Sequence, residues 1–95
     1  MFLTIAALLL AATAITAVVV YIIKYAKVKE QLRQLRVKQA QERVVALIHD
    51  GDYGVISGVW DNSSSTLEQG QVLKSSQIDE ETRQYLPENE IVEGF

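Results

Sequence analysis

FLTIAALLLAATAITAVVVYII, residues 2–23, is an unbroken run of 22 residues without a charged side chain. Leucine, isoleucine, valine and alanine dominate this run. As an α-helix rising about 1.5 Å per residue, it would be about 33 Å long, enough to cross a hydrocarbon core of about 30 Å. A chain of 95 residues has too little other material to surround a helix that is apolar on every side. The stretch therefore predicts a transmembrane helix over residues 1–23.

The charges beside this run predict how such a helix would be oriented. Three lysines follow it immediately. Because positive charge is retained on the cytoplasmic side of a membrane, we expect the N-terminus outside and the C-terminus in the cytoplasm, or on the matrix or stromal side in an organelle. Tyrosine rings favour the membrane–water interface. The residues expected at that interface are Tyr21, Lys24, Tyr25, Lys27 and Lys29.

The net charge of −3 conceals three blocks of different charge. Residues 24–48 hold seven Lys/Arg and two Glu, a net of +5, whereas residues 49–95 hold ten Asp/Glu and two Lys/Arg, a net of −8. The absence of cysteine excludes a disulfide scaffold and a zinc–cysteine site. The predicted segments are a transmembrane helix (1–23), a basic helical stalk (24–43) and a small acidic α+β domain (44–95).

The stalk is expected to continue the membrane helix as an amphipathic helix. No Gly or Pro interrupts it, and most of its residues are good helix formers. Its apolar stripe spans too few heptads for a coiled coil, but that stripe and the small side chains of the membrane segment could contact another helix. The expected helix-packing residues are Ala7, Ala11, Ala14, Val28, Leu32 and Leu35.

The basic side chains of the stalk are expected to contact anionic lipid headgroups. Nucleic acid is disfavoured as a partner, because the stalk lacks interleaved aromatic side chains for base stacking and an acidic domain follows it.

The acidic segment predicts two to four short strands. Residues 53–60 are rich in β-branched and aromatic side chains and predict a strand, in which two glycines indicate a bulge or close packing. Residues 66–74 predict a second strand, and residues 90–95 an edge strand. Residues 44–48 could end the stalk helix or open a strand, since periodicity cannot decide for so short a run.

One short helix is expected between these strands, ending before Pro87. Its start is either a capping box from Ser76 to Asp79 or a cap formed by Asp79 itself. The acidic residues of this helix and of the C-terminus could contact a basic partner surface or keep the domain in solution. The residues expected to dock on a partner are Trp60, Asp79, Glu80, Glu81, Glu88, Glu90 and Glu93.

The sequence carries no pattern that predicts catalysis. His49 is the sole histidine and neighbours Asp50 and Asp52, but no second histidine, serine-nucleophile elbow or glycine-rich phosphate loop accompanies it. The Asp50–Asp52 turn lacks the further ligands of a calcium loop. We therefore expect no enzyme, no cofactor and no metal.

The order of span, basic stalk and small β-rich domain resembles the YajC-like accessory subunits of the bacterial Sec translocase. Gly51 and Asp52, followed by residues 55–59, look like the Gly-Asp pair and glycine-containing β-run of that family. Residues 75–95 depart from the family pattern. The resemblance implies an accessory role in a protein translocase.

The expected function is that of a non-catalytic, single-pass membrane accessory or assembly subunit of a larger complex. Its acidic domain would dock on a partner at the cytoplasmic side. The alternatives are a self-associating membrane tether and the YajC-like role.

Overall fold

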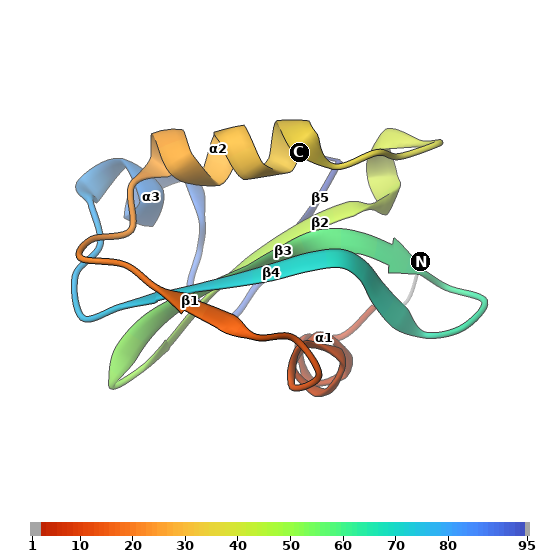
Figure 1. Ribbon diagram of the computed structural model, residues 1–95, viewed down its shortest axis with the longest axis horizontal. Helices are drawn as coiled ribbons and strands as arrows, with labels where there is room; N and C mark the ends of the chain where they lie inside the picture. Colours follow the sequence, from red (N-terminus) through yellow and green to blue (C-terminus); the bar gives the residue numbers. More distant parts are fainter. Residues whose placement is uncertain (1–2, 95) are drawn as a thin grey trace.

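A five-stranded sheet with helices on both faces forms the framework of the protein (Figure 1). The computed structural model describes residues 3–94, so Met1 and Phe2 of the predicted span and Phe95 of the predicted edge strand lie outside the described residues. The strand order is β1-β4-β3-β2-β5, with β1 and β4 parallel and the other neighbours antiparallel. The strands are β1 (Ala17–Val19), β2 (Arg43–Asp50), β3 (Asp52–Asp61), β4 (Thr66–Ser75) and β5 (Ile91–Glu93). The helices are α1 (Ile5–Ala12), α2 (Tyr25–Gln34) and α3 (Glu80–Tyr85), with a 3₁₀ turn, η1 (Ala40–Glu42).

The predicted transmembrane helix is wrong. Within residues 3–94, no helix combines the length and the apolar character needed to cross a membrane. The uncharged run instead divides into α1, a bend and β1, which pairs with β4 from Ala17↔Val72 to Val19↔Lys74. The expected fold class and the expected single-pass topology, with the N-terminus outside and the C-terminus in the cytoplasm, are therefore wrong as well.

Threonine side chains mark both ends of α1. The Thr4 hydroxyl accepts a hydrogen bond from the Ala7 backbone N–H at 3.2 Å, which caps the first turn. At the other end, the Thr13 hydroxyl donates to the Leu10 carbonyl at 2.7 Å. Beyond the bend, β-branched residues predominate from Ile15 onward, and they favour extended backbone.

Side chains of the sheet alternate between two apolar clusters, one on each face. Val45 and Leu47 join the cluster formed with α2 and Leu86, whereas Val44 and Ala46 join the cluster under α1. All four side chains are fully buried. Residues 44–48 therefore form a strand covered on both faces, and such a strand has a continuous apolar sequence.

The predicted stalk is helical over only part of its length. α2 ends at Gln34, and the chain then runs without helix to η1 and enters β2 at Arg43. The side chain of Gln69 holds this connection against β4: its Oε1 accepts from the Arg36 N–H at 2.9 Å and its Nε2 donates to the Arg36 carbonyl at 2.8 Å. The apolar side of α2 lies on the sheet of its own chain.

The strands predicted over residues 53–60 and 66–74 are confirmed as β3 and β4. The register between them shifts between Ser57 and Val59, which confirms the predicted irregularity. A Cβ on Gly58 would lie 2.8 Å from Leu67 Cδ1, so this glycine allows the close packing of the bulge.

Of the two starts considered for the short helix, the structure has Asp79 as the N-cap of α3. One carboxylate oxygen of Asp79 accepts from the Thr82 N–H at 2.9 Å. The other accepts from the backbone N–H of Tyr25, the first residue of α2, at 3.0 Å. Asp79 thus joins the starts of two helices that are adjacent in Figure 1.

Candidate functional site

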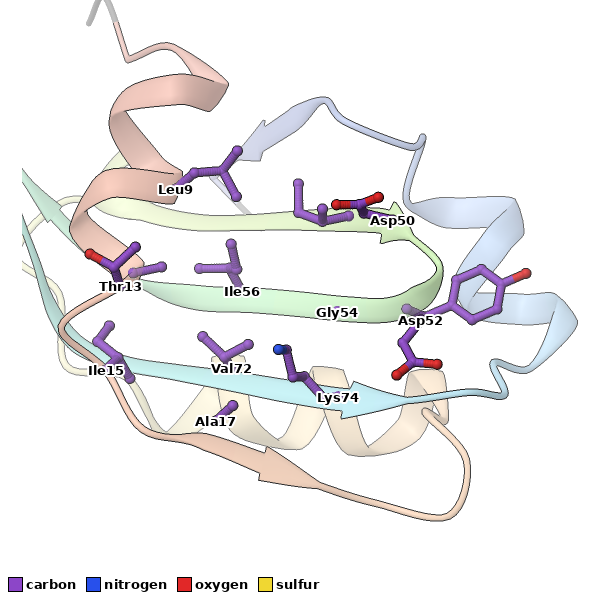
Figure 2. Close-up of a pocket in the computed structure, with 13 residues that line it drawn as sticks. Leu9, Thr13, Ile15, Ala17, Asp50, Asp52, Gly54, Ile56, Val72 and Lys74 are labelled. Carbon is purple, nitrogen blue, oxygen red and sulfur yellow. The ribbon is translucent and has the colours of Figure 1, made fainter.

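A groove lies between α1 and the turn that joins β2 to β3, on the sheet face that α1 only partly covers (Figure 2). Its volume is about 530 Å³, within the range of small-ligand sites. We call it the Gly54 groove. Its lining includes apolar side chains (Leu9, Ile48, Ile56 and Val72) and charged ones (Asp50, Asp52 and Lys74).

Gly54 forms the floor of the groove because it places no side chain on a face where its neighbours do. It pairs with Ile48 on β2 and with Lys74 on β4. A Cβ added to Gly54 would meet no atom closer than 3.9 Å, and its φ is not in the left-handed region. Neither steric crowding nor backbone geometry therefore requires glycine at this position.

This lack of a steric requirement gives a prediction for stability. Glycine within a strand costs roughly 0.5–1 kcal/mol relative to alanine, so Gly54→Ala should raise the free energy of unfolding by about that amount. Gly58→Ala should lower it by about 1–3 kcal/mol, because its Cβ would crowd Leu67. Urea denaturation of both variants measures the two effects. Destabilisation by Gly54→Ala would show that the space over Gly54 cannot accept a methyl group.

Charged side chains gather at the end of the groove away from α1. Asp50 and Asp52 pair across the turn at Gly51, where φ is 75°. Lys74 lies on β4 directly opposite Gly54. By strand alternation these three side chains share the face that carries Ile48, Ile56 and Val72. No ion pair or side-chain hydrogen bond links the three to other groups within the described residues.

The described contacts of the His49 ring are with an aromatic side chain and a carboxylate. His49 lies on the opposite sheet face from Asp50, stacks on Tyr53 with ring centroids 4.1 Å apart, and places Nδ1 3.1 Å from Glu88 Oε1. Ser57, a candidate nucleophile by residue type, is buried. Across residues 3–94, no group of three His, Cys, Asp or Glu residues is arranged to hold a metal ion.

The residues expected at a membrane interface lie around the start of α2. Tyr25 is buried and stacks on Tyr85 with centroids 4.9 Å apart. Burial raises the pKa of the Tyr25 hydroxyl, and the neighbouring Tyr85 and Glu81 raise it further. Lys29 Nζ lies 5.3 Å from the Tyr25 ring centroid. The exposed members of the set are Tyr21, Lys24, Lys27 and Lys29.

The residues expected to pack against another helix lie mostly against the sheet. Ala7 and Ala11 belong to α1 and are partly buried against the apolar cluster between this helix and the sheet, whereas Ala14 is exposed beyond the end of the helix. Val28 and Leu32 are buried in the cluster under α2, with Leu35 at its margin.

The residues expected to dock on a partner are dispersed in the structure. Trp60 is only 5% exposed, and its Nε1 donates to Asn62 at 3.0 Å. Asp79 is the helix cap, and Glu88 contacts His49. The remaining acidic side chains, all exposed, are Glu80, Glu81, Glu90 and Glu93.

Sequence reasoning missed Gly54 and Lys74 as site residues. The sequence indicates a turn with two carboxylates at Asp50 and Asp52, and alternation along a hairpin places both on one face of the sheet. Lys74 joins them only through the register of β3 with β4, which the bulge near Gly58 changes.

In comparisons with known proteins, the chain matches no protein family, no curated protein and no solved structure. The resemblance to YajC-like subunits therefore rests only on the short stretch from Gly51 to Val59.

Proposed function

We propose that this chain is a non-catalytic binding module that takes a small ligand in the Gly54 groove. The ligand would combine an apolar body of a few carbon atoms with an ammonium group. The observation that supports this most directly is Gly54 itself, a glycine that leaves a central strand open although alanine would fit.

The apolar part of the groove suits the body of such a ligand. Ile48 is only partly buried and Leu9 is 39% exposed, so a ligand over Gly54 would cover apolar surface of these two side chains that is now open to water. Removing apolar surface from water contributes about 25 cal/mol per Å². This contribution is largest for a branched alkyl group that covers the exposed parts of Ile48 and Leu9.

The charged end of the groove suits an ammonium group. Asp50 and Asp52 are exposed and near each other across the turn, so both carboxylates can approach one cation. Exposed ion pairs contribute only about 0–1 kcal/mol each, because water screens them. We therefore expect a dissociation constant on the order of 1 mM for a ligand as small as 3-methylbutylamine.

Titration with 3-methylbutylamine, followed by backbone amide chemical shifts, tests the proposal. Shifts should concentrate at residues 48–54 and 72–74. Gly54→Val should weaken binding at least about tenfold by filling the floor. Replacing both Asp50 and Asp52 with Asn should weaken it about three- to tenfold.

Glu93→Gln is the matched control, because it removes an exposed carboxylate on β5, outside the groove. It should leave the dissociation constant unchanged. Absence of saturable shifts in the folded protein would overturn the proposed function, as would equal weakening by Glu93→Gln and the double variant.

A further inference from the structure

We infer that the ligand of the Gly54 groove is an apolar α-amino acid, recognised at its ammonium, its carboxylate and its side chain. This inference rests on the proposed function and adds Lys74 to it. A ligand whose only charged group is an ammonium would place a second cation beside the Lys74 ammonium. A ligand that also carries a carboxylate could form an ion pair with Lys74.

Three kinds of group surround Gly54 in different directions. Gly54 pairs with Lys74 on β4 and with Ile48 on β2. Neighbouring strands are spaced so that the backbone of each partner lies about 5 Å from the backbone of Gly54. Along β3, Asp52 and Ile56 lie two residues away on the same face, at about 7 Å. The open space over Gly54 is therefore flanked by one cation, one carboxylate and two apolar side chains.

The α-carbon of an amino acid carries groups that match these neighbours. With that carbon over Gly54, the ammonium can face Asp52 and Asp50, the carboxylate can face Lys74, and an alkyl side chain can lie against the isoleucines. Figure 2 shows Asp50 and Lys74 on opposite sides of Gly54, one on β2 and the other on β4, which keeps the two charges of the ligand apart. A ligand that carries only one charge could use only one of these two charged contacts.

A three-point arrangement also distinguishes mirror images. Exchanging two substituents on the α-carbon places the carboxylate toward Asp52 or the alkyl group toward Lys74. The two enantiomers of leucine should therefore bind with dissociation constants that differ about threefold or more.

Three compounds of matched shape separate the contributions: L-leucine, 3-methylbutylamine, which lacks its carboxylate, and 4-methylpentanoate, which lacks its ammonium. We expect leucine to bind about three- to fivefold more tightly than the amine, and the acid to bind most weakly. D-leucine provides the enantiomer comparison. Chemical-shift titration at constant ionic strength gives all four dissociation constants.

Lys74→Met provides the decisive variant, because it keeps most of the side-chain length and removes the charge. It should weaken the binding of leucine about threefold. It should strengthen the binding of the amine, because the repulsion between the Lys74 ammonium and the ammonium of the ligand is removed. A general change in groove shape would move both affinities in the same direction. Lys27→Met, which replaces an exposed lysine on α2 outside the groove, is the control and should change neither affinity.

The outcomes separate this inference from the proposed function. Binding of the amine with equal or weaker binding of leucine would overturn the inference and leave the proposed function standing. Equal affinities for both enantiomers, or parallel changes for leucine and amine in Lys74→Met, would overturn it too. Absence of saturable binding of the amine would overturn the proposed function itself.

Discussion

Replacing Leu8 with alanine should lower the free energy of unfolding by about 2–5 kcal/mol. Leu8 is fully buried in the cluster between α1 and the sheet, where its neighbours include Ile56, Trp60 and Val72. The substitution removes buried methyl groups and leaves a cavity that the rigid sheet can fill only in part. Urea denaturation followed by fluorescence of Trp60, the sole tryptophan, measures the loss within the same cluster.

Leu10→Ala is the matched control for this measurement. Leu10 lies in the same helix two residues later but is 74% exposed. Both substitutions replace leucine with alanine in α1, so their effects on helix propensity are similar. The control should change stability by no more than about 0.5 kcal/mol. Equal effects at the two positions would contradict the packing of α1 on the sheet.

The error over the first 23 residues has a physical explanation. A helix and a strand that each pack on one sheet are as free of charge as a membrane helix, so length and hydropathy alone could not separate them. One signal was present. Eight of the eleven residues from Thr13 to Ile23 are β-branched, against two of ten from Leu3 to Ala12, and this change of composition coincides with the end of α1.

The later elements were easier to predict because their signals are local. The strand at residues 53–60 follows from β-branched and aromatic content, and the cap by Asp79 follows from spacing to the next helical residues. The Gly54 groove depends instead on register. Gly54 and Lys74 become neighbours only when β3 and β4 pair with a bulge between them, and β1 joins β4 across a long segment of chain.

Replacing Asp79 with alanine should lower the free energy of unfolding by about 2–4 kcal/mol. Its carboxylate accepts hydrogen bonds at the starts of both α2 and α3, from Tyr25 and Thr82. The Thr82 hydroxyl also donates to it and is fully buried, so removal of the carboxylate leaves a buried donor without its acceptor. Urea denaturation measures the loss, and Glu80→Ala, an exposed neighbour, should cost no more than about 0.5 kcal/mol.

Asp79→Asn distinguishes the hydrogen bond at the start of α2 from the cap of α3, and it also removes the negative charge. An asparagine oxygen can still cap α3, but its NH₂ group cannot accept from the Tyr25 N–H, so we expect an intermediate loss of about 1–2 kcal/mol.

Burial acts to raise the pKa of Asp79, but hydrogen bonds from Thr82 and Tyr25, together with nearby Lys24, hold it below its ordinary value. The stabilisation is therefore complete above the unfolded-state pKa of about 4 and is lost as the pH falls through the lower folded-state pKa. The stability difference between wild type and Asp79→Asn should accordingly shrink on acidification below about pH 4. A difference that stays constant from pH 7 to pH 2 would show that this carboxylate does not link the two helices.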